Sequence, residues 1–203
     1  MKKLELKPLY IVVLCLIFQS TLYLTSKSLQ GTPTLIGNTI DTKIPFIIYF
    51  IIPYVIWYLL IILIPYFYYK KDKEVFKKYI ISYLFMSIIA NTIFILWPTT
   101  VTRPQITQNS ILYSLTNLIY TIDTPAINCF PSLHCAVSFI WILYILKLKD
   151  TNIFIKLLVI FTALLIIIST LCIKQHVFID MISGITLSIV VYFIVRIYFK
   201  YKR

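Results

Sequence analysis

Long apolar stretches, separated by short polar connections, dominate the pattern of hydrophobic and polar positions along this chain. A helix that crosses a membrane needs about 20 mostly apolar residues, and six stretches come close to that length. They cover residues 8–25, 45–69, 77–97, 131–147, 153–173 and 177–198. The pattern therefore predicts an all-α, polytopic bundle of about six transmembrane helices, with residues 1–203 forming a single membrane domain.

The composition excludes a water-soluble globular domain. Hydrophobic residues make up 60% of the chain and charged residues 13%, whereas a typical soluble domain is about 45–50% apolar and about a quarter charged. We therefore expect membrane lipids to be the solvent and the cell membrane to be the location. The net charge of +12 is spread over short lysine clusters between apolar stretches. This arrangement predicts contacts with anionic lipid headgroups and no nucleic-acid binding.

Basic residues separate the polar connections into two alternating groups. They gather before the first stretch, in residues 70–78, in residues 147–156 and at the C-terminus, whereas the long connection 98–130 contains one basic residue, Arg103. Cytoplasmic connections of membrane proteins carry an excess of lysine and arginine. Both termini are therefore predicted to be cytoplasmic, and the long connection is predicted to be extracytoplasmic.

Within this long connection, residues 108–122 have the pattern of a helix. Ile111, Leu115, Leu118 and Ile122 recur at helical spacing. A helix that lies on the outer leaflet fits this pattern, either as a lid over a site or as a short packing helix.

Both histidines of the chain begin predicted spans on the same side of the membrane. His134 lies at the outer start of the fourth stretch and His176 at the outer start of the sixth, while Arg103 follows the outer end of the third. Asp180 comes four residues after His176, so on a helix the two side chains share a face. The carboxylate can hold one imidazole nitrogen and leave the other free to attack phosphorus. A purely structural histidine–aspartate pair would fit the same spacing.

The residues around His134 and Arg103 suit the binding of an anion. Pro131 and Ser132 predict the first turn of a helix, with N–H groups and a hydroxyl directed at the anion. His134, about one turn deeper, can donate a proton to a leaving alcohol oxygen. Arg103 offers a planar fork of donors for two phosphate oxygens, although a lipid anchor at the interface is the alternative for this residue. Together these residues predict a phosphoryl-transfer site.

The same residues resemble the three-part signature of the type 2 phosphatidic acid phosphatase (PAP2) superfamily, which reads Lys-x6-Arg-Pro, Pro-Ser-x-His and Ser-Arg-x5-His-x3-Asp. The matches lie within residues 77–185 and are Arg103-Pro104, Pro131-Ser132-Leu133-His134, and Ser169, His176 and Asp180. The resemblance implies a helical membrane fold and a phosphohistidine on His176, oriented by Asp180, with His134 as proton donor. It also implies that Arg103 and Ser132 bind the phosphoryl oxygens, with Ser169 as a further candidate, and that no metal or cofactor is needed.

Three positions depart from this signature. Leu96 stands at the lysine position of the first motif, Thr170 at the arginine position of the third, and Leu133 precedes His134 where glycine is common. Lys174 is a candidate replacement for one missing phosphate-binding cation, or else a lysine that anchors the chain at the membrane interface. The string KQHVFID resembles the branch related to inositol phosphorylceramide and sphingomyelin synthases, which transfer a phosphoryl headgroup to an alcohol.

The leading hypothesis is therefore hydrolysis of a lipid phosphate or a polyprenyl diphosphate. Headgroup transfer to a lipid alcohol is the alternative, and a small transporter or membrane scaffold is the non-enzymatic one. A vanadium haloperoxidase shares the fold family but is soluble and strongly cationic at its cofactor. Cys129 and Cys135 would lie outside the cytoplasm, where they could form a disulfide.

Overall fold

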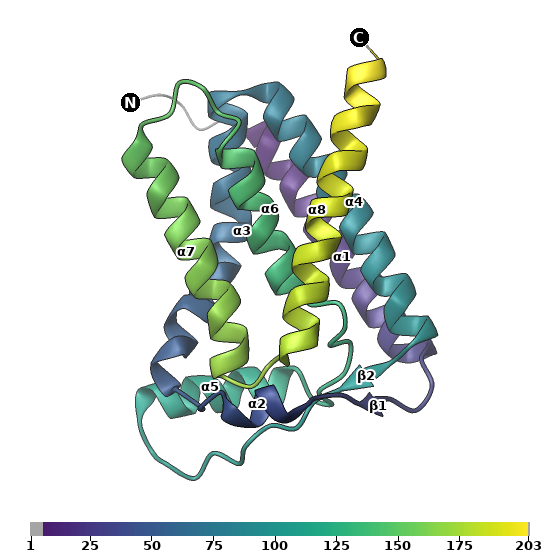
Figure 1. The fold of residues 1–203 in the computed structure, drawn as a ribbon, viewed down its shortest axis with the longest axis vertical. Coiled ribbons are helices and arrows are strands. Elements are labelled where there is room, and N and C mark those ends of the chain that lie inside the picture. Colours follow the sequence, from purple (N-terminus) through teal and green to yellow (C-terminus); the bar gives the residue numbers. More distant parts are fainter. Residues whose placement is uncertain (1–5, 203) are drawn as a thin grey trace.

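The structure is a computed structural model that describes residues 6–202. Lys2, Lys3 and Arg203, which contribute to the predicted charge asymmetry, lie outside the described residues. In chain order the elements are α1 (Leu6–Leu29), β1 (Thr34–Leu35), α2 (Thr39–Lys43), the 3-10 helix η1 (Ile48–Phe50), α3 (Ile51–Lys71), α4 (Lys73–Leu96), β2 (Thr99–Thr100), α5 (Ile111–Ile122), α6 (Leu133–Ile145), α7 (Ile153–Cys172) and α8 (Phe178–Tyr201). Helices α1, α3, α4, α6, α7 and α8 form a bundle, and α2 and α5 lie across one of its ends (Figure 1).

The predicted all-α membrane bundle is confirmed. Within residues 6–202, five helices are long and apolar enough to cross a membrane, namely α1, α3, α4, α7 and α8. Large apolar side chains such as Leu59, Phe161 and Ile194 are exposed on the outside of the bundle, as expected where lipid is the solvent. The start of α1 and the end of α8 lie at the end of the bundle opposite to α5 (Figure 1).

The fourth predicted span is shorter than the apolar stretch 131–147 indicated. Helix α6 has 13 residues, which at a rise of 1.5 Å per residue is about 20 Å long, so this stretch is not a full-length span. The helix begins only after the N-cap Ser132, whose hydroxyl accepts a hydrogen bond from the N–H of Cys135 at 3.3 Å. Trp141 and Ile145 are fully buried, and α6 packs against α7 and α8. Its apolar character therefore reflects contact with the other helices.

Hydrogen bonds of polar side chains link the helices in the interior of the bundle. The hydroxyl of Tyr68 on α3 donates to the carbonyl of Trp141 on α6 at 2.8 Å. On the same helix, Tyr144 is 2.8 Å from Ser82 of α4. Small and polar residues at helix contacts are typical of membrane bundles, where apolar side chains gain little by leaving lipid.

The backbones of helix α6 and helix α8 come close together at Gly184. A Cβ atom on Gly184 of α8 would lie 2.3 Å from the carbonyl oxygen of Ser132, so a side chain larger than hydrogen does not fit there. The N–H of Ser132 donates to the carbonyl of Asp180 at 3.1 Å. This contact sets the start of α6 against the first turns of α8.

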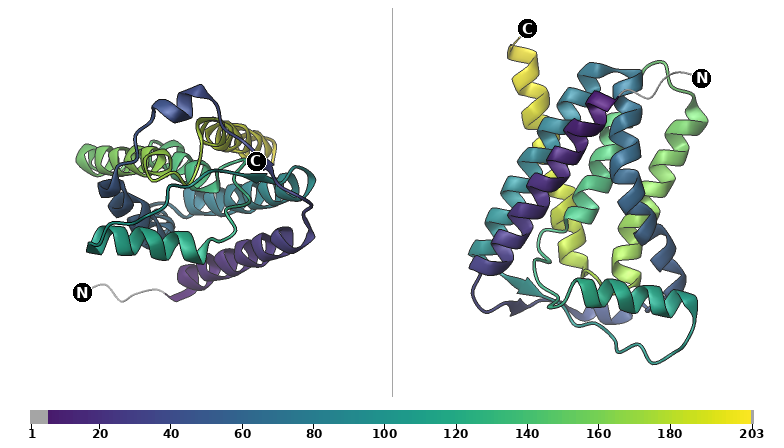
Figure 2. Two further views of the ribbon diagram at one scale, coloured as in Figure 1. Left: turned by 90° about the horizontal axis from the view of Figure 1, so that it is seen from below. Right: turned by 180° about the vertical axis from the view of Figure 1, so that it is seen from behind.

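The predicted helix in residues 108–122 is α5, which crosses the end of the bundle (Figure 2). Thr116 and Tyr120 face the protein and are buried, whereas Ile111, Leu118 and Ile122 form an exposed apolar stripe. This arrangement agrees with a helix that packs at the membrane interface, while a lid function stays a prediction.

A two-stranded parallel sheet ties the connection after α1 to the connection after α4. Thr34 pairs with Thr99 and Leu35 with Thr100. The segment that contains β1 and α2 is thereby drawn over the end of the bundle (Figure 1). The hydropathy pattern carried no signal for this arrangement, and the segment forms one wall of the site.

Candidate active site

His176 and Asp180 are in contact, but not because they lie on one helix as the spacing suggested. His176 precedes α8, whose N-cap is Val177, and Asp180 is in the first turn. The Nδ1 atom of His176 is 3.2 Å from Oδ2 of Asp180, and the same oxygen accepts a hydrogen bond from the N–H of Val177 at 3.1 Å. Asp180 is fully buried. The carboxylate therefore caps the helix and holds the imidazole at the same time, and Nε2 is the ring nitrogen that does not take part in this contact.

His134 lies in the first turn of α6, inside a cluster of aromatic side chains from α3. Its ring stacks on Tyr54, with 4.8 Å between ring centroids, and is 4.2 Å from the Trp57 ring. The ring of His176 is 6.0 Å away. The Nε2 atom of His134 is buried and has no protein partner. The stacking fixes the plane of the His134 ring, which lies next to the ring of His176.

Ser132 is buried at the N-terminus of α6. Its hydroxyl oxygen accepts the capping bond from Cys135 described above, and its proton is available to another acceptor because a hydroxyl both donates and accepts. Its backbone N–H, which the sequence suggested as an anion ligand, is instead bonded to Asp180.

Arg103 is fixed by residues that the sequence did not point to. One guanidinium nitrogen, Nη2, donates to the Asp123 carboxylate and to Oε1 of Gln175, and the other, Nη1, donates to the carbonyl of Asp123 at 3.2 Å. The guanidinium also lies over the ring of Tyr120, 4.9 Å from its centroid. The hydroxyl of Tyr23 donates to the second oxygen of Asp123 at 2.8 Å. Tyr120 of α5 and Asp123, the C-cap of this helix, therefore hold the arginine that the signature assigns to phosphate.

Burial raises the pKa of Tyr120 to about 12, although the neighbouring Arg103 guanidinium opposes that rise. The Tyr120 hydroxyl is therefore neutral at any working pH and donates to the carbonyl of Ile173. This bond fastens α5 to the segment that leads into His176.

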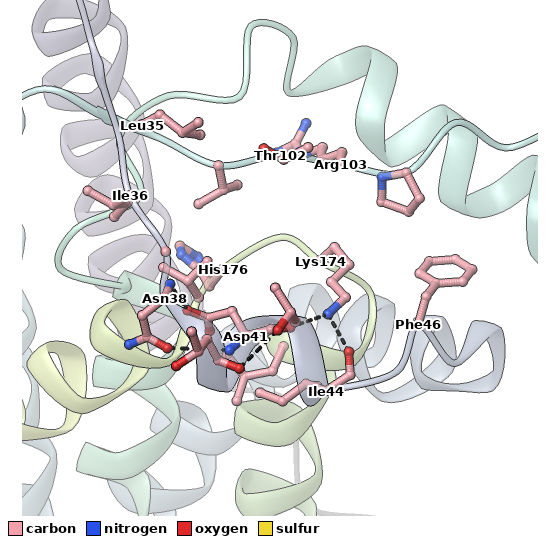
Figure 3. A pocket seen from close by; sticks show the side chains of 17 residues that line it. Leu35, Ile36, Asn38, Asp41, Ile44, Phe46, Thr102, Arg103, Lys174 and His176 are labelled. Atoms are coloured by element: carbon pink, nitrogen blue, oxygen red, sulfur yellow. Dashed lines mark hydrogen bonds between the residues drawn. The ribbon is translucent and has the colours of Figure 1, made fainter.

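Two predicted substrate ligands, Ser169 and Lys174, bond elsewhere in the protein. The Ser169 hydroxyl donates to the carbonyl of Ile166 at 2.6 Å, within α7. The ammonium group of Lys174 donates to the carbonyls of Asp41, at 3.0 Å, and Ile44. Lys174 thus anchors the α2 segment, and Figure 3 shows both bonds.

A pocket of about 740 Å³ opens beside His176, Arg103 and Lys174 (Figure 3). Residues 35–46 form one wall, and residues 101–104 form another. Many of the side chains are apolar, such as Leu35 and Phe46, and Asn38 is among the polar ones. Asp41 accepts a hydrogen bond from the N–H of Phe178 at 2.7 Å, so this wall is attached directly to the first turn of α8. His134 is not among the residues that line the pocket.

Cys129 and Cys135, whose pairing the sequence left open, do not form a disulfide, because both are free thiols. Cys129 contacts the carbonyl of Ala126, and Cys135 contacts Thr170 on α7. Burial raises the pKa of the Cys129 thiol, which keeps it protonated. Among the described residues, no three histidine, cysteine or acidic side chains gather as metal ligands would.

Comparison with known proteins bears on this geometry. Neither the curated proteins nor the solved structures yielded a match to the chain. A family model described as the PAP2 superfamily matches residues 20–194. The match extends beyond the motif-bearing residues to include the end of α1, all of α3 and most of α8, but it does not show membership of the sphingomyelin-synthase-like branch. The chain belongs to the PAP2 superfamily.

Proposed function

We propose that this protein hydrolyses a lipid phosphate or a polyprenyl diphosphate through a phosphohistidine intermediate on His176. Membership of the superfamily supports phosphatase chemistry in general. The observation that carries the proposal is the His176–Asp180 pair at the edge of a pocket that also exposes Arg103 and Lys174. The pair offers an imidazole nucleophile that an adjacent carboxylate orients, and histidine is one of the side chains that form covalent intermediates.

In the first step, the lone pair on Nε2 of His176 attacks phosphorus, and the bond between phosphorus and the lipid oxygen breaks. The electron pair of that bond goes to the oxygen, which receives a proton from His134. Asp180 holds the Nδ1–H of His176 and stabilises the positive charge that develops on the ring. In the second step His134 takes a proton from water, the water oxygen attacks phosphorus, and the P–N bond breaks to release phosphate.

Arg103 and Ser132 bind the phosphoryl oxygens in this proposal, as the superfamily signature implies. The buried Nε–H of Arg103 has no protein partner, and the Ser132 hydroxyl retains a proton to donate. The ammonium group of Lys174 contributes positive charge at the pocket wall. Its partners are backbone carbonyls, which do not neutralise this charge. Ser169 supports the end of α7 and is the weakest of the predicted ligands.

The protein acts in the cell membrane with both termini in the cytoplasm and the site on the extracytoplasmic side. The lysine distribution supports this orientation. The start of α1 and the end of α8 lie at the opposite end of the bundle from His176. Cytoplasmic chain ends are therefore consistent with an extracytoplasmic site.

Headgroup transfer to a lipid alcohol is the second candidate function. The pocket of about 740 Å³ is much larger than a phosphate group, and its apolar walls would accept a second substituent on phosphorus or an incoming alcohol. Both functions use His176 and differ in whether water or an alcohol breaks the P–N bond.

The test supplies purified protein with phosphatidic acid, phosphatidylglycerol phosphate and a polyprenyl diphosphate, with and without a lipid alcohol, and follows free phosphate and new phospholipid. We expect phosphate release that persists in EDTA and is inhibited by vanadate. His176→Ala should lose both the activity and the phosphoenzyme detected by mass spectrometry of the intact protein. Full activity in His176→Ala, or a loss in EDTA that a divalent cation restores, would refute the mechanism.

A further inference from the structure

Two positions that supply cations in the superfamily signature, those of Leu96 and Thr170, hold uncharged residues in this chain. Thr170 replaces the arginine of the third motif, and its hydroxyl donates to the carbonyl of Ile167 at 2.8 Å. Lys174 is held by the carbonyls of Asp41 and Ile44. The phosphoryl group therefore has fewer cations around it than the signature would supply, and a further uncharged donor would compensate for this difference.

Gln175 has a side-chain amide nitrogen without a protein partner. It directly precedes His176 and is 3% exposed. Its Oε1 atom accepts a hydrogen bond from Nη2 of Arg103, which fixes the orientation of the amide because an arginine only donates. The Nε2 atom is buried without a protein partner, and so is Nε of Arg103. Buried donors without partners are rare, and each calls for an explanation.

The backbone holds this amide in place. The N–H groups of Gln175 and His176 both donate to the carbonyl of Thr170, each at 3.0 Å. Lys174 anchors the same segment to the α2 wall. A donor that is fixed before the substrate arrives loses little entropy when it binds a developing negative charge.

We propose that Gln175 is a substrate-binding residue whose amide Nε2, together with Nε of Arg103, donates to the oxygens of the phosphoryl group on which His176 acts. The inference rests on the proposed function and extends it. A neutral amide donates the hydrogen bonds that the signature arginine, replaced here by Thr170, would otherwise donate. The site then binds the phosphoryl group with less positive charge than the signature would supply.

A different role for Gln175 is to position Arg103 through Oε1, and two substitutions separate the roles. Gln175→Glu keeps the acceptor for Arg103 but removes the amide donors, whereas Gln175→Met removes both. If Gln175 binds the phosphoryl group, both variants should lose affinity for orthovanadate, and kcat/KM should fall roughly 10²-fold, as for the loss of one oxyanion donor. If Gln175 only positions Arg103, Gln175→Glu should bind vanadate as tightly as the wild type.

Asn38→Asp is the matched control for the added negative charge. Asn38 lines the pocket beside His176, and its Oδ1 accepts the capping bonds from Ile40 and Asp41, which an aspartate also accepts. We expect this variant to weaken vanadate binding much less than Gln175→Glu does, with both variants melting close to the wild type. Equal losses in Asn38→Asp and Gln175→Glu would mean that charge repulsion is the cause and would overturn the inference.

The phosphoenzyme separates this inference from the proposed function. A wild-type protein that forms a His176-dependent phosphoenzyme, together with a Gln175→Glu variant that behaves like it, contradicts the role of Gln175 alone. A wild-type protein that forms no phosphoenzyme and binds no vanadate contradicts both.

Discussion

The two histidines differ in the groups that hold them, and this difference supports different roles. His176 contacts a buried carboxylate through Nδ1, which favours a ring that gains positive charge when Nε2 bonds to phosphorus. His134 is held by the aromatic rings of Tyr54 and Trp57. Aromatic stacking orients an imidazole without providing a counter-charge, which suits a group that passes a proton to the leaving oxygen.

The effect of His134→Ala should therefore depend on the leaving group. With a lipid alkoxide as the leaving group, we expect kcat/KM to fall by about 10²–10⁴-fold, the usual contribution of general acid catalysis. With p-nitrophenyl phosphate, whose leaving group needs little protonation, the same variant should keep much more of its activity. Steady-state rates on the two substrates provide the measurement.

His176→Ala and Asp180→Asn serve as the comparison variants. His176→Ala should lose activity on both substrates, and Asp180→Asn should lie between, because it disturbs the orientation of the imidazole without deleting it. If His134→Ala loses activity equally on both substrates while His176→Ala still traps phosphate, the two roles are reversed. If neither histidine matters, the protein does not work by this mechanism.

At the scale of elements, the contact between α6 and α8 sets the relative position of Ser132, His134 and Asp180. Gly184 allows the two backbones to approach, and a Cβ at this position would lie 2.3 Å from the Ser132 carbonyl and 3.2 Å from the N atom of Ala136. Both neighbours belong to a helix backbone, so neither can move away as the end of a flexible side chain could.

Gly184→Ala should therefore lower stability by about 1–3 kcal/mol, the usual cost of overpacking. It should also lower kcat/KM by roughly 10²-fold, since a shift of about 1 Å at a catalytic group can cost that much. Thermal unfolding in detergent and rates on one lipid phosphate are the measurements. Gly31→Ala is the control, because a Cβ there meets no atom within 4 Å. A Gly184→Ala protein that matches this control would show that the close approach is unimportant for the site.

Hydropathy predicted the long helices because a spanning helix exposes apolar side chains to lipid along most of its length. It overestimated the length of α6, because a short helix buried among other helices is as apolar as a helix that spans the membrane. The predicted contact between His176 and Asp180 is present, although it arises from the first turn of α8 and the residues before it rather than from one helix face.

The remaining parts of the site depend on contacts between residues far apart in the sequence. Lys174 reaches Asp41, and Arg103 reaches Gln175. No local periodicity encodes such contacts, and the segment that carries β1 and α2 has neither a long apolar stretch nor a charge cluster. The motif positions could therefore be identified from the sequence, whereas the pocket wall and the partners of Arg103 could not.

At the scale of the whole molecule, the bundle has two chemically different ends. The end that carries α5 and the pocket also carries Arg103, His176 and the first turn of α8 (Figure 1, Figure 3). The turn between α3 and α4, with Lys70, Lys71 and Lys73, lies at the other end together with the start of α1 and the end of α8 (Figure 1). The lysine excess predicts that this second end faces the cytoplasm.

Cysteine labelling in intact cells tests this orientation. Thr107, in the connection before α5, and Lys73, at the start of α4, are both exposed, so a thiol at either position is open to a reagent on its own side. The four native cysteines are buried and would be replaced, so that every signal comes from the introduced residue. We expect a membrane-impermeant maleimide to label Thr107→Cys in intact cells and to label Lys73→Cys only after the membrane is permeabilised. The reverse pattern would place the pocket on the cytoplasmic side. The proposed extracytoplasmic location of the site would then be wrong, even if His176 acts as proposed.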